Sequence, residues 1–167
     1  YTAIPMVNVS GNTWCAKIPN QPDGSFVKYY VCAEDCAPTP NSSCNPDVPG
    51  TSDPLFYTVR DGGLTIYDVQ FVPSSFSSGA SGYEGMDVTV TGVVTASAES
   101  DNLGTVFIQE EGVLSWAGLW LVNDASLTTL NVGDKVTVTG TIEESFGFTR
   151  MDVSSVTLGQ NVELVLF

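Results

Sequence analysis

The sequence contains no histidine, and this absence limits the chemistry that the chain could perform. Without histidine there is no Ser-His-Asp or Cys-His catalytic machinery, no His-ligated zinc and no haem attachment through a Cys-x-x-Cys-His motif. The acid–base groups that remain are carboxylates, which occur as adjacent pairs at Glu110/Glu111 and Glu143/Glu144. Neighbouring side chains of a strand point to opposite faces, so neither pair forms a natural acid–base dyad. We therefore predict no catalytic residue and a protein that is not an enzyme.

The cysteines are clustered near the start of the 167-residue chain, at Cys15, Cys32, Cys36 and Cys44. An even, clustered set of this kind predicts two disulfides and an oxidising compartment. The spacing lacks the paired Cys-x2-Cys knuckles of common zinc sites, so we predict no metal site. Three connectivities remain open. The preferred one joins Cys15 to Cys32 and Cys36 to Cys44.

The charge balance restricts the partners that the chain could bind. It has 19 acidic and 5 basic residues, for a net charge of −14. Nucleic-acid binding depends on Lys and Arg that neutralise phosphates, so nucleic acid is a disfavoured partner, while neutral glycans remain plausible. No apolar run approaches the roughly 20 residues that a membrane span needs. A first residue other than Met fits a removed signal peptide, and we expect an extracellular or cell-surface location.

Two further kinds of site are suggested by single residues. Asn8 and Asn41 each begin an Asn-x-Ser motif, the acceptor pattern for N-glycosylation. Hard oxygen ligands suited to calcium occur in predicted loops, but no Asp-x-Asp-x-Asp-Gly loop is present, so we favour ordinary surface acids and expect no cofactor. The candidate calcium ligands are Asp53, Asp61, Asp101, Asn102, Asn123 and Asp124.

The pattern of apolar residues predicts an all-β chain in three parts. Helical periodicity is nearly absent and β-branched residues dominate the apolar set. The three parts are an N-terminal extended arm (1–11), a disulfide-stapled β/loop region (12–63) and a β-barrel (64–167). Strands are expected at 25–32, 64–72, 86–96, 105–110, 118–123, 134–143, 148–156 and 161–167. Short strands without a crossover helix favour an antiparallel barrel or sandwich.

Residues 64–156 contain an ordered set of strand-like phrases. These are TIYDVQ (65–70), VTVTGVVTA (88–96), VFIQEEG (106–112), WAGLWLVN (116–123) and VGDKVTVTGTIEESFGFTRM (132–151). In this order they resemble the OB-like domain of secreted bacterial cell-surface proteins and extracellular nucleases. The resemblance implies a five-stranded Greek-key barrel, with Gly92 and Gly140 where strands bend. It does not extend to residues 1–63.

Aromatic side chains in this segment form a candidate binding surface. Trp120 alternates with Leu119 and Leu121, so it faces the outside of the barrel if the leucines fill it. OB-folds stack bases or sugars on such a face. The alternative, which we favour here, is that residues 12–63 cover Trp120. The candidate ligand-binding residues are Trp116, Trp120, Phe146 and Phe148.

Both ends of the chain are apolar and extended in character, which suggests assembly. A terminal segment that cannot satisfy its own backbone can pair with a sheet edge of a neighbour, although pairing within its own domain is an equal alternative. The candidate assembly residues are Ile4, Met6, Val7, Val162, Leu164 and Leu166. Our leading expectation is an extracellular structural subunit that associates with itself into a filament or surface layer. The alternative is an accessory binding module of a secreted hydrolase, with a glycan as its ligand.

Overall fold

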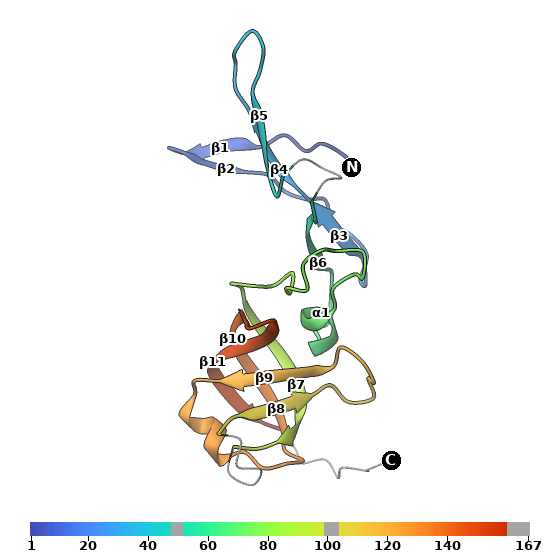
Figure 1. Cartoon of the computed structure of the whole chain (residues 1–167), viewed down its shortest axis with the longest axis vertical. Helices are drawn as coiled ribbons and strands as arrows, with labels where there is room; N and C mark the ends of the chain where they lie inside the picture. The colour runs from blue at the N-terminus through green and yellow to red at the C-terminus, as the bar shows by residue number, and fades with distance from the viewer. Residues whose placement is uncertain (48–51, 99–103, 160–167) are drawn as a thin grey trace.

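The computed structural model describes residues 1–47, 52–98 and 104–159. The molecule is elongated, with a β-barrel at one end of its long axis and β-hairpins at the other (Figure 1). A short helix, α1 (Ile66–Gln70), precedes the barrel in the chain, and a 3-10 helix, η1 (Ala125–Thr129), lies between two of its strands. Neither helix of the described ranges is long and apolar enough to cross a membrane.

The barrel is closed by five strands in an OB-like Greek-key order. They are β7 (Asp87–Ala96), β8 (Val106–Gln109), β9 (Gly118–Val122), β10 (Lys135–Ser145) and β11 (Phe148–Leu158). Around the barrel they follow the order β7-β8-β9-β11-β10, and β10 pairs with β7 to close it. The pairing of β9 with β11 is parallel, and the other four are antiparallel. The expected fold class, all-β with an OB-like barrel, is confirmed.

The barrel core follows from the alternation of apolar and hydroxyl residues along its strands. The buried valines of β7 are Val88, Val90, Val93 and Val94. Between two of them, Thr89 faces outward and shares a hydrogen bond with Thr139 of β10 (Oγ1–Oγ1 2.8 Å). A period of two therefore separates a dry interior from a surface built of paired threonines.

Two glycines allow the closest backbone approaches in the barrel, where the resemblance implied bends. A Cβ on Gly140 would collide with the carbonyl oxygen of Asp152 on β11, and the β10/β11 register shifts beside it. A Cβ on Gly92 would lie 2.8 Å from Cδ1 of Ile66, which is part of the helix that packs against the barrel. A side chain at Gly140 would overlap backbone atoms, whereas one at Gly92 would displace the end of the Ile66 side chain and crowd the Gln109 carbonyl oxygen (3.0 Å).

The predicted strand at 64–72 is wrong, because residues Ile66–Gln70 form α1. The side chain of Thr65 accepts a hydrogen bond from the Asp68 backbone N–H, and the Asp68 carboxylate accepts one from the Thr65 backbone N–H. This reciprocal capping box starts the helix. Ile66 and Val69 are both fully buried, so the helix covers part of the barrel core.

The first half of the chain forms three separate two-stranded sheets. Their strands are β1 (Val7–Ser10), β2 (Thr13–Cys15), β3 (Phe26–Tyr29), β4 (Val31–Glu34), β5 (Ser42–Asn45) and β6 (Leu55–Thr58). The pairs are β1/β2, β4/β5 and β3/β6. The predicted strand at 25–32 is thus divided at Tyr30 between β3 and β4. The predicted strand at 161–167 lies outside the described residues.

The β3/β6 sheet connects these hairpins to the barrel. The Phe56 ring packs against Phe26 (centroids 5.1 Å apart) and against Phe76 (5.3 Å). Phe26 in turn meets Phe71, directly after α1, with a centroid distance of 6.2 Å. Gly82 packs so closely on Phe56 that a Cβ would overlap its ring. The junction is therefore an aromatic cluster, a geometry in which such rings attract one another beyond the burial of their area.

Candidate functional site

A cleft of about 610 Å³ opens on the outer wall of the barrel beside β8, β9 and β11. We call it the aromatic cleft. Its lining includes Thr105, Phe107, Trp116, Trp120 and Phe148. Three of the four predicted ligand-binding residues, Trp116, Trp120 and Phe148, therefore lie around one concavity.

Trp120 is positioned by the alternation of β9. Leu119 and Leu121 are buried in the core, so Trp120 projects outward, as predicted. Its ring stacks on that of Phe107 with centroids 6.2 Å apart and an interplanar angle of 18°. Its Nε1–H donates to Oγ1 of Thr105 at 2.5 Å. The indole is thereby held in one orientation with its polar edge satisfied.

A cation lies beside this aromatic pair. Arg150 of β11 is the register partner of Trp120 across the parallel β9/β11 pairing. Its guanidinium carbon lies 5.4 Å from the Trp120 ring centroid, within the range of a cation–π contact. Glu143 accepts from the same guanidinium, with an Nη2–Oε2 distance of 2.8 Å. The positive charge is thereby fixed over the ring and partly neutralised.

The other predicted aromatic residues differ in their placement. Trp116 has a positive φ of 58° and packs its ring edge against Phe71 (centroids 6.0 Å apart). Phe148 lines the cleft and is largely exposed. Phe146 is fully exposed and is not among the residues that line the cleft.

Sequence reasoning missed two members of this site, Phe107 and Arg150. Phe107 alternates with the buried Val106 and Ile108 in β8, and this alternation was a usable signal for an outward ring. Arg150 could not have been found in the same way, because its contact with Trp120 depends on the parallel register of β9 and β11.

The favoured alternative, that residues 12–63 cover Trp120, is wrong. The residues that line the aromatic cleft all come from position 70 onward. In Figure 1 the hairpins formed by β1, β2, β4 and β5 extend away from the barrel rather than across β8 and β9. The cleft is therefore open in the described part of the chain.

The first 47 residues contain no buried residue. We call residues 1–47 the hairpin region. Many of its apolar side chains are instead exposed, among them Val7 (63% exposed), Trp14 (55%) and Val31. Of the predicted assembly residues, Ile4 and Val7 are exposed and Met6 is half-buried. The other three, Val162, Leu164 and Leu166, lie outside the described residues.

Residues Val7–Ser10 pair as β1 with β2 of the same chain, so this part of the N-terminal segment is satisfied locally. The proposed boundary at residue 11 falls in the turn of that hairpin. Residues 1–6 have no regular secondary structure, and the Tyr1 ring lies edge-on to Tyr30 with centroids 5.1 Å apart.

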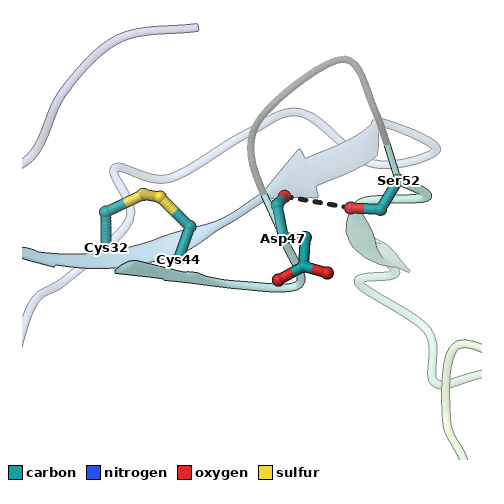
Figure 2. The surroundings of a disulfide bond; sticks show 4 residues. All are labelled: Cys32, Cys44, Asp47 and Ser52. Atoms are coloured by element: carbon teal, nitrogen blue, oxygen red, sulfur yellow. Dashed lines mark hydrogen bonds between the residues drawn. A yellow bond between two sulfur atoms is a disulfide. The ribbon is translucent and has the colours of Figure 1, made fainter. Parts of the chain in front are cut away.

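One disulfide is present, and it joins Cys32 to Cys44 (Figure 2). The two residues face each other directly in the antiparallel β4/β5 pairing, which explains this choice of partner. The preferred connectivity, Cys15–Cys32 with Cys36–Cys44, is therefore wrong. Cys15 and Cys36 are free thiols, and both are exposed.

The acidic pairs identified from the sequence are engaged separately. Glu110 accepts a hydrogen bond from the Tyr67 backbone N–H (2.8 Å), and Glu111 forms an ion pair with Lys135. Glu143 pairs with Arg150, and Glu144 accepts from the Ser81 N–H and the Thr149 hydroxyl. Each carboxylate thus has its own structural partner, and no two converge on a common point.

The calcium candidates are likewise dispersed. Asp53 accepts from the hydroxyl of Ser77 and from the backbone of Ser77 and Ser78, and these hydrogen bonds hold its pKa below the ordinary value. Asp124 caps η1 instead. In the ranges that the structure describes, no group of three or more acidic or cysteine residues could hold a metal ion. Asp101 and Asn102 lie outside those ranges.

Both glycosylation candidates are exposed. The Asn8 side chain donates to the carbonyl of Gly11 (2.8 Å), and that of Asn41 donates to the Asp35 carboxylate (2.6 Å). Comparison of the chain with known proteins found no matching family model, no matching curated protein and no matching solved structure.

Proposed function

We propose that this chain is an extracellular structural subunit that associates with further copies of itself through the hairpin region. The observation that carries the proposal is the lack of any buried residue in residues 1–47. Isolated two-stranded hairpins are marginally stable in water, and a region without a core exposes apolar area that folding would normally bury. Contact with another copy would supply that missing burial.

The distribution of charge favours a second copy as the partner. The hairpin region contains Lys17 and Lys28 against four acids, so it contributes only −2 of the chain's −14. The four acids are Asp23, Glu34, Asp35 and Asp47. Two barrels repel each other, whereas a contact made through the hairpin region brings together the least charged parts of the two molecules.

The hairpins also offer open strand edges. The sheets β1/β2 and β4/β5 have only two strands each, so every one of these strands has an edge with no strand partner in the described chain. Such edges accept a strand from a neighbouring molecule. When the two contacting surfaces differ, the contact repeats without closing and produces a fibre or lattice.

The test is electron microscopy of the native chain at micromolar concentration, together with two surface variants. Trp14→Ser removes an exposed apolar ring from the hairpin region, and Leu114→Ser removes a fully exposed apolar side chain from the β8–β9 loop as a matched control. We expect regular assemblies for the native chain and for Leu114→Ser, and dispersed particles for Trp14→Ser with an unchanged circular dichroism spectrum. Dispersed particles of the native chain would refute the proposal.

A second candidate function is the binding of a neutral glycan in the aromatic cleft. It is favoured by the stacked rings of Trp120 and Phe107, with the Arg150 guanidinium over the Trp120 ring and the Thr105 hydroxyl at its Nε1 edge. Aromatic platforms of this kind stack sugars or nucleic-acid bases. The net charge of −14 disfavours a nucleic acid, because a nucleic acid is itself a polyanion. The chain would then also act as an accessory module that holds a secreted hydrolase on its polysaccharide substrate.

Titration of tryptophan fluorescence with an array of neutral oligosaccharides tests this second function. Stacking on one aromatic ring is worth about 1–3 kcal/mol, so Trp120→Ala should weaken binding by about 5- to 150-fold. Trp14→Ala is the control, because Trp14 lies in the hairpin region and not in the cleft. Equal affinity of Trp120→Ala and the native chain, or no binding by the native chain, would exclude the cleft as a glycan site.

A further inference from the structure

We propose that Cys36 of one copy and Cys15 of the next form an intermolecular disulfide that locks the assembly covalently. This inference rests on the proposed self-association, and it assigns the two cysteines that have no partner within the chain. It names a specific pair of contact points, one in the β4/β5 hairpin and one in the β1/β2 hairpin.

Cys36 lies in the loop between β4 and β5. Figure 1 shows this loop at the end of the molecule farthest from the barrel. The loop is ordered by the Asp35 carboxylate, whose Oδ1 accepts from the backbone N–H groups of Ala37 (3.1 Å) and Asn41 (3.0 Å). The Cys36 thiol is exposed on this ordered tip, where it can meet another molecule.

Cys15 lies in the other hairpin, which is formed by β1 and β2. It is the last residue of β2 and pairs with Val7, so it sits at the open end of the β1/β2 hairpin, opposite the turn. Figure 1 shows β2 leading from this end toward β3 and the barrel. Its thiol is exposed as well. A bond from the tip of one copy to the base of the next joins two different surfaces, which is the arrangement that propagates.

The oxidised pair in the same region argues that these thiols do not remain reduced. Cys32 and Cys44 are joined within the β4/β5 hairpin. Disulfides persist in oxidising compartments, and exposed thiols in such a compartment are themselves subject to oxidation. Because the fold leaves Cys15 and Cys36 unpaired within one chain, a disulfide partner for either comes from outside it. A neighbouring copy that contacts the hairpin region would bring a cysteine of its own close to the free thiol.

The chemistry balances with a small-molecule disulfide such as oxidised glutathione as the oxidant. The Cys36 thiolate attacks one glutathione sulfur, which breaks the glutathione S–S bond and releases one reduced glutathione. The Cys15 thiolate of the next copy then attacks the Cys36 sulfur of the mixed disulfide and releases the second. Two protein thiols lose two electrons and two protons, and one glutathione disulfide gains them.

Non-reducing gel electrophoresis of the native chain assembled with oxidised glutathione tests the bond. We expect a ladder of covalent multimers that collapses to one band under dithiothreitol. Cys15→Ser and Cys36→Ser should each give no covalent multimers alone. An equimolar mixture of the two variants should give dimers and nothing larger, because only one cross-pair remains in each contact.

Three results would overturn the inference. They are a native chain that stays a single covalent unit, dimers formed by either single variant alone, and a chain that carries only glutathione adducts by mass spectrometry. Electron microscopy of the Cys15→Ser/Cys36→Ser double variant separates this failure from that of the proposed function. Assemblies of the double variant without any covalent ladder in the native chain would leave the self-association standing and remove only the disulfide.

Discussion

Among single residues, Asp68 connects the most parts of the fold. It is 3% exposed and accepts from Arg60 through Nε (2.8 Å) and Nη2 (2.7 Å). It also accepts from the Thr65 backbone N–H at the start of α1. Burial alone would raise the pKa of Asp68, but the hydrogen bonds from Arg60 and Thr65 outweigh it and hold the pKa below its ordinary value. The ionised carboxylate is therefore part of the native fold.

Replacing Asp68 with Asn should destabilise the chain at neutral pH by about 3 kcal/mol, because it leaves the Arg60 charge without its buried partner. A carboxylate whose folded pKa is lowered stabilises the fold above its unfolded value, near 4, and this contribution is lost as the pH falls through the folded value. The difference between native and variant unfolding free energies should therefore shrink below pH 4. Urea denaturation at several pH values measures it, with the exposed Glu84→Gln as control. A difference that is constant with pH would contradict this account.

At the scale of the elements, the barrel depends on the close approach of β10 and β11 at Gly140. The register of the two strands shifts between Thr139 and Gly140, and a side chain there would overlap the Asp152 carbonyl. Backbone atoms cannot move aside as the end of a flexible side chain can, so the barrel has no inexpensive way to admit a methyl group at this point.

We expect Gly140→Ala to destabilise the barrel by about 2–3 kcal/mol, the cost of overpacking a dense interior. Gly118→Ala at the start of β9 is the matched control, since a Cβ there meets no atom within 4 Å. Its effect should stay within about 0.5 kcal/mol. Thermal unfolding of the two variants compares them directly. Equal melting temperatures would show that the bulge can relax around a side chain.

The barrel strands could be predicted because their signal is local. Along β7 and β10 apolar and hydroxyl residues alternate, and this period of two appears in the sequence itself. Helix α1 was missed because its β-branched residues Ile66 and Val69 suit a strand equally well. The deciding signal was the reciprocal cap of Thr65 and Asp68, which does not depend on apolar periodicity.

The features that could not be predicted depend on register. Cys32 pairs with Cys44 because the β4/β5 ladder places them opposite each other, and the spacing of four cysteines does not contain that information. The contact of Arg150 with Trp120 likewise follows from a parallel pairing between strands distant in sequence. Three rings of the aromatic cleft were therefore predicted from the sequence, whereas Phe107 and the Arg150 cation were missed.

For the molecule as a whole, stability is divided between two unlike parts. The barrel has a buried core of aliphatic residues, whereas the hairpin region has none and is held by strand pairing and one disulfide. Parts that share few buried contacts open independently, each with its own free energy. The aromatic junction around Phe56 is where the two would separate.

Reduction of Cys32–Cys44 should therefore loosen the hairpin region and leave the barrel folded. Loss of a native disulfide in a small domain lowers the free energy of unfolding by about 2–5 kcal/mol. Hairpins without a buried core are only marginally stable, so this loss is enough to unfold them. Hydrogen exchange with and without dithiothreitol should show lost protection in β4 and β5 and none in β7 and β10. Simultaneous loss of protection in all four strands would show instead that the chain unfolds as one cooperative unit.

The closed barrel has one further consequence. Because β10 pairs with β7, the described barrel strands form a closed sheet, and none of them is an edge strand that could pair with a strand of another molecule. A polymer joined through the hairpin regions would therefore present one barrel on the outside of each subunit. If each barrel carried even a weak sugar site, a repetitive polysaccharide would bind many barrels at once. The avidity of the polymer would then rise with the number of its subunits.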